Sequence, residues 1–316
     1  MDTVDQIGPA EAAALGARVA ANVGLAVKVA PEVLRDVLVC LLAEGHVLIE
    51  DHPGVGKTAL VRALSLSIEA DYARVQCTSD LLPADVVGTN VFDQSTGRFE
   101  FRPGPVFANL VLVDEINRAS PKTQSGLLEC MQERHVTVDI HTHELARPFL
   151  VLATQNPLEY EGTYPLPEAQ LDRFMVRVSL GYPSPQAEAD MLGAHADHDR
   201  VLDLRPVCTV AQVLGAQRAA AAVHASEALR RYVVGVLEGT RTDPRLDLGA
   251  SPRAGLMLLK AAKALAALQG RDHALPDDVQ QVAGAVLAHR LLLAPDALGV
   301  EPAQVVRDVL TRTPAL

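Results

Sequence analysis

The sequence predicts an α/β domain with a parallel sheet, followed by a domain built only of helices. Through about the first 180 residues, short apolar runs alternate with longer amphipathic stretches of helical period, a pattern typical of parallel strands covered by helices on both faces. A Gly/Pro-rich segment at 181–185 comes next, and beyond it the apolar residues recur at helical spacing. We therefore expect two domains, 1–183 and 184–316.

Each expected element follows from its local pattern. Continuous apolar runs such as 110–113 are typical of central strands that are buried on both faces. Strands are expected at about 47–49, 73–77, 110–113, 149–152 and 175–180, and helices at about 10–27, 32–43 and 57–68.

Two segments predict hairpins added to this sheet. The first pairs 91–92 with 98–101 around a polar turn at 94–97. In the second, an alternating strand at 135–140 leads to a polar tip formed by His141, Thr142 and His143. His135, His141 and His143 with Glu144 suggest a metal site, but an exposed polar turn is the stronger interpretation, because no fourth ligand has fixed spacing.

Composition disfavours several classes of protein. The net charge is −11, from 39 acidic and 28 basic residues, and there is no Trp, so a surface that tracks nucleic acid is not expected. The four cysteines form no CxxC pair and lie in apolar or amphipathic stretches, which indicates buried thiols. The first residues lack a signal-peptide pattern, and two lysines interrupt the most apolar stretch, 254–270. We expect a cytoplasmic protein without a membrane span.

A glycine-rich turn between the first predicted strand and the next helix indicates a phosphate-binding loop. Gly54 and Gly56 allow backbone N–H groups to converge on phosphate oxygens, and the helix N-terminus adds partial positive charge. Lys57 would bridge the β- and γ-phosphates, and the Thr58 hydroxyl would be a ligand of Mg²⁺. The predicted nucleotide-binding residues are Asp51, His52, Pro53, Gly54, Val55, Gly56, Lys57, Thr58 and Asp114.

Asp51 departs from the usual GxxxxGK[ST] pattern, which has glycine at this position. The residue lies on the approach to the loop rather than against the phosphates, so we expect the change to be tolerated. It leaves the affinity for nucleotide, and not the identity of the loop, as the open question.

Two adjacent acids end the apolar run at 110–113. Because side chains alternate along a strand, Asp114 and Glu115 should point in different directions. Asp114 is placed to hold Mg²⁺ through water beside Thr58, and Glu115 to orient and deprotonate the attacking water. This second acid favours a hydrolase over a P-loop kinase.

Asn156 ends the next buried strand, at the edge of the sheet where open α/β sheets bind ligands. It could hydrogen-bond the γ-phosphate and the attacking water. The alternative is a turn initiator, since Asn-Pro is a common turn signal.

Two arginines are candidates for a second phosphate contact. Arg173 precedes the last predicted strand, where it could reach the γ-phosphate of a neighbouring subunit as an arginine finger; the alternative is an ion pair with Asp172 or Glu168. Arg253 falls in the first turn of a helix that Ser251 would cap. A cation is disfavoured there by the helix dipole, which suggests a nearby anion, and in a lid folded over the nucleotide that anion would be the γ-phosphate. The alternative is a solvated surface arginine.

Together these residues resemble the MoxR family of AAA+ ATPases. The most specific stretches are DEINRASPKTQ at 114–124, ATQNP at 153–157 and EGTYPLPEAQLDRF at 161–174. The likeness is dense over about 30–181 and looser in the second domain. It implies an AAA+ αβα sandwich with a P-loop and an all-helical lid. It also implies roles for Lys57 and Thr58 (Walker A), Asp114 and Glu115 (Walker B), Asn156 (sensor 1), Arg173 (arginine finger) and Arg253 (sensor 2).

The resemblance further implies ATP and Mg²⁺ as cofactors, a hexameric ring, and chaperone-like work on a protein client. A partner with a von Willebrand factor A domain often accompanies such ATPases. Two other functions remain open: a motor subunit of a metal-chelatase-like complex, which shares both hairpins, and a nucleic-acid translocase, which acidic charge and scarce aromatic residues disfavour.

Overall fold

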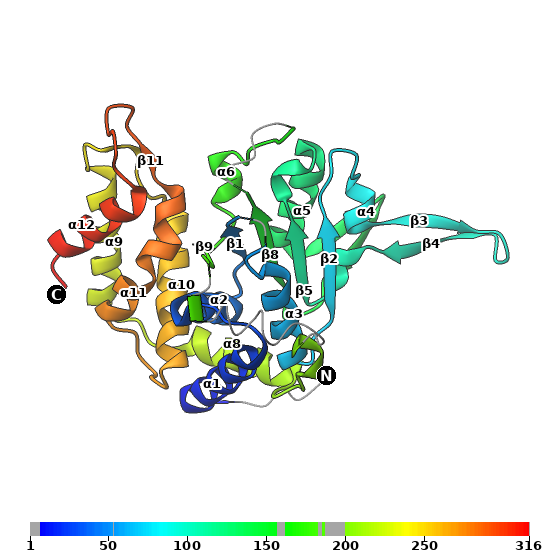
Figure 1. The fold of residues 1–316 in the computed structure, drawn as a ribbon, viewed down its shortest axis with the longest axis horizontal. Coiled ribbons are helices and arrows are strands. Elements are labelled where there is room, and N and C mark those ends of the chain that lie inside the picture. The colour runs from blue at the N-terminus through cyan, green and yellow to red at the C-terminus, as the bar shows by residue number, and fades with distance from the viewer. Residues whose placement is uncertain (1–6, 53, 157–161, 183–184, 187–199, 316) are drawn as a thin grey trace.

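The computed structural model of the protein describes residues 7–52, 54–156, 162–182, 185–186 and 200–315. Its centre is a five-stranded sheet with the strand order β2-β5-β8-β1-β9, in which every neighbouring pair is parallel (Figure 1). The strands are β1 (Val47–Glu50), β2 (Tyr72–Gln76), β5 (Leu110–Asp114), β8 (Leu150–Gln155) and β9 (Val176–Val178). The five predicted strands are confirmed, and their bounds differ from the prediction by one to three residues.

The register of the sheet decides where the site lies. Residues 110–113 of β5 are fully buried, as a strand covered on both faces requires. Because all strands are parallel, their carboxyl ends meet at one edge: Gln76 pairs with Asp114, and Glu50 pairs with Gln155. We call this the carboxyl edge and the opposite one the amino edge.

The expected helices of the first domain also form, within one or two residues of their predicted bounds. In α5, the Ser120 hydroxyl accepts the Thr123 N–H at 3.3 Å and so caps the first turn. The helices are α1 (Pro9–Ala26), α2 (Pro31–Leu42), α3 (Lys57–Ser67), α4 (Pro83–Val87), α5 (Pro121–Glu133) and α6 (Glu168–Leu171), with short 3₁₀ turns at Pro105–Phe107 (η1) and Ile116–Arg118 (η2).

Both predicted hairpins are present, but the tip of the second one was misplaced. Strands β3 (Gly88–Asp93) and β4 (Arg98–Pro103) pair antiparallel and extend far from the body of the domain (Figure 1). Strands β6 (His135–Val138) and β7 (His141–Glu144) also pair. The turn is therefore at Asp139–Ile140, where Asp139 adopts a positive φ of 56°, a conformation that Asp tolerates better than most residues. His141, Thr142 and His143 belong to the return strand.

The lid is helical, with one addition that the sequence pattern did not predict. Its helices are α8 (Val210–Ala222), α9 (Glu227–Arg241), α10 (Pro252–Leu268), α11 (Pro276–Leu287) and α12 (Pro302–Arg312), with 3₁₀ turns at Arg200–Asp203 (η3) and Ala288–Arg290 (η4). The addition is an antiparallel pair of short strands, β10 (Leu246–Leu248) and β11 (Leu292–Leu293). Strands of two or three residues are too short to show a period.

The first helix joins the lid to the sheet domain. Helix α1 packs against α3 on one side and against α8 and α10 of the lid on the other. The contact with α10 is close, since a Cβ added to Gly16 would lie 2.4 Å from Leu268 Cδ2. One continuous apolar core includes α1, α2, part of the sheet and the lid helices. The domain boundary expected at 183/184 lies outside the described residues and remains a proposal.

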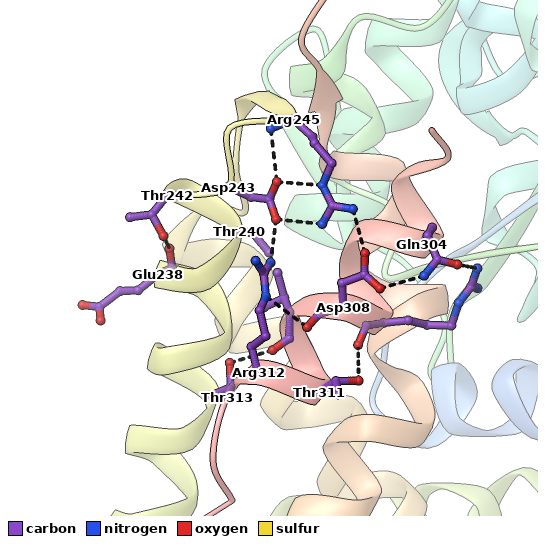
Figure 2. Close-up of polar contacts among 12 residues, drawn as sticks. Glu238, Thr240, Thr242, Asp243, Arg245, Gln304, Asp308, Thr311, Arg312 and Thr313 are labelled. Carbon is purple, nitrogen blue, oxygen red and sulfur yellow. Dashed lines mark hydrogen bonds and ion pairs between the residues drawn. The ribbon is translucent and has the colours of Figure 1, made fainter. Parts of the chain in front are cut away.

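A network of charged side chains holds the end of α9 to α12 (Figure 2). Arg245 donates from Nε and Nη2 to the two carboxylate oxygens of Asp243, both at 2.9 Å, and from Nη1 to Asp308 Oδ2 at 2.7 Å. Arg312 adds a contact to Asp243 at 2.6 Å. We call these four residues the lid cluster. The two arginines hold the pKa of Asp243 well below its usual range.

None of the helices in the described part of the chain combines the length and hydropathy that crossing a membrane requires.

Candidate nucleotide site

The glycine-rich turn has the backbone that a phosphate cradle requires. It joins the end of β1 to the start of α3, with Gly54 at φ 86° and Gly56 at φ 92°. Only glycine adopts such values without strain. A Cβ added at either position would meet nothing within 4 Å, so the space in front of the turn is open. The turn and the N-terminus of α3 therefore fit an anion such as a triphosphate. Pro53 of the predicted set lies outside the described residues.

Lys57 and Thr58 begin α3, directly after this turn. The Lys57 ammonium group donates to the carbonyl oxygen of Asp51 at 3.1 Å, so it already lies across the mouth of the loop. Thr58 is half-buried. Its hydroxyl and the Asp114 carboxylate are hard oxygen donors of the kind that Mg²⁺ prefers, and the chemistry of this donor set fits that ion.

Asp114 ends β5 at the carboxyl edge, where two side chains from neighbouring strands hold its carboxylate. Arg74 Nε donates to Oδ2 at 2.7 Å, and the Thr154 hydroxyl donates to Oδ1 at 3.3 Å. The carboxylate is largely buried, while half of the Arg74 side chain is exposed. The pair is thus open to exchange on the solvent side.

The Glu115 side chain points away from that of Asp114, but the cause is the backbone conformation of Glu115 and not alternation along the strand. It lies outside β5 in a left-handed conformation, with φ 56° and ψ 51°, which costs free energy for a non-glycine residue. Its N–H donates to Thr154 Oγ1 at 2.9 Å. Its carboxylate contacts Gln76 at 3.2 Å and Arg118 at 2.9 Å. We call Asp114, Glu115, Arg74 and Arg118 the sheet-edge cluster.

Sequence reasoning missed the side chains that position these acids, namely Arg74, Gln76, Arg118 and Thr154. A partial signal existed, because Arg74 and Gln76 are two residues apart on a strand and so share a face. Only the pairing of β2 with β5 puts that face beside Asp114. Cys77 directly follows β2, and burial raises the pKa of its thiol to about 12, which makes it a poor nucleophile.

Asn156 lies at the carboxyl edge as predicted, directly after β8, and it is buried. The N–H of Asp51 donates to the carbonyl of the preceding residue, Gln155, at 3.2 Å. This bond joins the end of β8 to the entry of the phosphate-binding turn. Lys57, Asp114, Glu115 and Asn156 thus come together at one edge of the sheet, from three adjacent strands.

Arg173 and Arg253 are at the other edge. The N–H of Met175 donates to the carbonyl of His46, which directly precedes β1, so the segment before β9 lies at the amino edge. There Arg173 Nη1 donates to the Leu128 carbonyl at 2.7 Å. The ion pairs of Asp172 in the described structure are with Arg290 and Arg253 instead.

Arg253 has the local structure that the sequence predicted. Ser251 caps α10 by accepting the Ala254 N–H at 3.1 Å, and Pro252 is the first helical residue. The nearby anion is Asp172, whose Oδ2 lies 3.8 Å from Arg253 Nε. The lid therefore presents Arg253 at the amino edge rather than over the phosphate-binding turn of the same chain. A cavity of about 700 Å³ opens at this junction, with lining residues that include Glu168, Asp172, Arg241, Ser251 and Arg290.

Comparison with known proteins agrees with this geometry. Residues 46–176 match the ATPase family associated with various cellular activities (AAA), and residues 238–309 match the AAA lid domain. A protein from Cytophaga hutchinsonii, whose crystal structure was solved as that of a candidate ATPase, has the same fold. Its TM-score is 0.89 at 36% identity, over 96% of each chain. The chain therefore belongs to the AAA-type ATPases and is an ATP-binding hydrolase with a helical lid.

The relatives narrow the family further. Chaperone MoxR1 of Mycobacterium tuberculosis is 42% identical over 88% of this chain and 76% of its own length. Protein MoxR of Methylorubrum extorquens is 33% identical over 88% of this chain and 87% of its own. The protein YeaC of Bacillus subtilis is 50% identical over 87% and 86%. Within the AAA-type ATPases, the chain is a member of the MoxR family.

Proposed function

We propose that this MoxR-family ATPase uses ATP hydrolysis to remodel or mature a protein client in a chaperone-like manner. One relative carries the name chaperone. The observation that carries the proposal is the β3–β4 hairpin, which projects from the domain (Figure 1). Phe92 and Phe99 pack edge to face on it and stay 51% and 71% exposed. Exposed aromatic side chains on a projecting element suit contact with another protein.

The hydrolysis step is assigned to the carboxyl edge. The Gly54–Gly56 turn and Lys57 would hold the triphosphate, and Thr58 and Asp114 would hold Mg²⁺, partly through water. When bound, the metal would neutralise charge on the β- and γ-phosphates. Glu115 would take a proton from the attacking water, and Asn156 would hydrogen-bond that water and the γ-phosphate.

Two arginines would complete the site of a neighbouring subunit in a hexameric ring. Arg173 and Arg253 share the amino edge, about one strand length (~13 Å) or more from the phosphate-binding turn of their own chain. In a ring, the amino edge of one subunit would face the carboxyl edge of the next. The same chain would then bind one nucleotide and act on another, which makes hydrolysis depend on assembly.

Replacing the proposed base tests the hydrolytic role. Glu115→Gln should bind ATP normally and lose about 10²–10⁴-fold in turnover, the contribution of a general base. Lys57→Ala should lose ATP binding itself, measured by calorimetry. Normal phosphate release by Glu115→Gln would falsify the role of this acid.

Mixing variants tests the shared site. Arg173→Ala and Lys57→Ala subunits should be inactive alone and partly active when mixed, because each supplies what the other lacks. No recovery at any mixing ratio would rule out a site between subunits.

The client and a partner with a von Willebrand factor A domain can be sought with the Glu115→Gln variant as a trap. Capture with ATP, followed by mass spectrometry, should recover the client, and Lys57→Ala is the matched control. Stimulation of turnover by single-stranded DNA, with a steep salt dependence, would instead favour a translocase. Capture of a metal-inserting assembly would favour the chelatase-like alternative.

A further inference from the structure

Asp51 is a buried carboxylate at the entry of the phosphate-binding turn, where the usual pattern has glycine. Only 5% of the residue is exposed. Its carboxylate accepts hydrogen bonds from the Ser179 hydroxyl at 3.1 Å, from the Leu180 N–H, and from the Gly181 N–H at 3.3 Å. A buried carboxylate is costly unless such donors compensate it, and glycine could make none of these bonds.

The backbone of Asp51 is tied to the nucleotide site at the same time. Its N–H donates to the Gln155 carbonyl at 3.2 Å, and its own carbonyl accepts from the Lys57 ammonium group at 3.1 Å. One residue thus contacts the end of β8, the phosphate-binding lysine and the segment 179–181. A shift of Lys57 changes the surroundings of Asp51 directly.

The segment 179–181 is where the chain leaves the sheet. It follows β9, and Gly181 turns the chain with a φ of 66°. The next residue, Tyr182, stacks on His52 with ring centroids 6.0 Å apart and planes inclined by 21°. Asp51 and His52, at the entry of the turn, therefore both contact the segment 179–182, through which the chain leaves the sheet domain.

We propose that Asp51 is a positioning residue that latches the phosphate-binding turn to the chain leaving for the lid, so that nucleotide binding sets the placement of the lid. The proposal rests on the proposed function, since it assumes that Lys57 moves onto phosphate. It also explains why an acid is compatible with a phosphate site: its charge is directed at the N–H groups of 180–181 and not into the cradle. Asp51→Gly, which restores the usual pattern, should therefore impair the ATPase rather than improve it.

The latch itself can be measured by hydrogen exchange at the two amides that donate to it. In Asp51→Gly, exchange at Leu180 and Gly181 should become at least about tenfold faster, the fold-change expected for losing one hydrogen bond to a charged group. Asp51→Asn keeps an acceptor of the same shape and should show a smaller change. Unchanged exchange at both amides in Asp51→Gly would overturn the proposal.

The coupling is measured by separating binding from turnover. Asp51→Gly should keep the Kd for ATP within about threefold and the KM nearly unchanged, while kcat falls roughly tenfold, since the contacts between the turn and the segment 179–181 are lost. If Asp51 only repelled phosphate, Asp51→Gly and Asp51→Asn would both bind ATP more tightly and keep full turnover. That result would also overturn the proposal.

A second variant leaves the turn untouched. Ser179→Ala removes one of the three donors from outside the nucleotide site and should reproduce part of both effects. Ser95→Ala, at the tip of the β3–β4 hairpin, is the matched control and should change neither. Equal behaviour of the two serine variants would count against the latch. If the wild-type chain neither bound nor hydrolysed ATP, the proposed function would fail, while the exchange result would still decide whether the latch exists.

Discussion

The sheet-edge cluster and the lid cluster each combine two carboxylates with two arginines, yet the two are built differently. In the lid cluster, the Asp243 side chain is 1% exposed and accepts three hydrogen bonds from the guanidinium groups of two arginines and a fourth from the Arg245 N–H. In the sheet-edge cluster, Asp114 is paired with Arg74, whose side chain is half exposed. From this difference in burial we expect the lid cluster to stay closed and the sheet-edge cluster to open more easily.

The difference follows from what happens when a partner is lost. A buried carboxylate that loses its guanidinium groups keeps its desolvation cost, so the lid cluster resists opening. A half-exposed arginine returns to water at little cost. At the proposed Mg²⁺ site, Asp114 would therefore exchange Arg74 for the metal ion at little cost, whereas loss of Arg245 from Asp243 should lower stability.

The largest predicted effect comes from neutralising Asp114. Asp114→Asn should lower ATP turnover by about 10²–10³-fold, because a charged oxygen is lost from the proposed Mg²⁺ site. The free energy of unfolding should change by less than about 1 kcal/mol, since its arginine partner is solvated. Turnover assays with a Mg²⁺ titration and urea unfolding of the same sample measure both quantities. A large loss of stability would mean that the two clusters are alike.

Neutralising the buried acid of the lid cluster should lower stability and leave turnover unchanged. Asp243→Asn should lower the free energy of unfolding by about 2 kcal/mol, because the two arginines lose the negative charge of their buried acceptor. Turnover per folded molecule should be unchanged. Asp308→Asn is the control, since its side chain is 37% exposed and the loss of its charge should cost clearly less stability. Equal costs at the two positions would show that burial does not govern the lid cluster.

Acid should weaken the sheet domain before it reaches the lid cluster. His46 is buried with Nδ1 accepting the Val151 N–H and Nε2 donating to the Met131 carbonyl, and burial lowers its pKa to about 4. Between pH 6.5 and 4, the unfolded state thus binds more protons, so stability falls as pH falls, by about 2 kcal/mol at pH 5 from His46 alone. The pKa of Asp243 is lowered instead, so its contribution is lost only below the usual carboxyl range.

Urea unfolding at pH 7.5 and pH 5 measures this effect. Because burial also lowers the pKa of His289 and raises that of Asp36, the His46 part is isolated by comparison with His46→Gln. In this variant, the loss of unfolding free energy between pH 7.5 and pH 5 should be smaller by about the same 2 kcal/mol. An identical slope in both proteins would remove His46 as the cause.

The smallest predicted effect is the difference in stability between variants of Arg245 and Arg74. Arg245→Gln should cost more stability than Arg74→Gln, by roughly 1 kcal/mol, because Arg245 makes a two-pronged contact with a buried acid. Urea unfolding of both variants at pH 7.5 gives the difference. If Arg74→Gln were the more destabilising change, the sheet-edge pair would be structural after all.

Much of the fold could be predicted because the main elements carry strong local signals. Apolar runs such as 110–113 and the Ser-Pro starts of α5 and α10 hardly depend on the rest of the chain. The second hairpin was placed less well because its return strand, β7, is polar and mostly exposed, so that no apolar pattern shows where that strand begins. Ile140, at the observed tip, is 87% exposed, although an apolar residue in a sequence usually indicates a buried position.

The parts of the candidate site formed by contiguous residues could be predicted. The parts formed by contacts between strands that are distant in the chain could not. The glycine turn and the acid pair are contiguous in the chain. The contacts of Arg74 and Thr154 with Asp114 depend on the order of strands in the sheet, which local patterns do not contain. The position of Arg253 was predicted only as far as its helix cap, because which edge of the sheet it reaches depends on how the lid docks.

The sequence by itself determined the main strands and helices in their order along the chain, the phosphate-binding turn and the family, because the signal for each lies in neighbouring residues. Tertiary structure alone decided that Asp51 contacts the exit of the sheet domain, that two arginines gather at the amino edge, and that one acid cluster is sealed while the other stays open. Burial and hydrogen bonding between residues more than 100 positions apart, such as Asp51 and Leu180, exist only once the chain has folded.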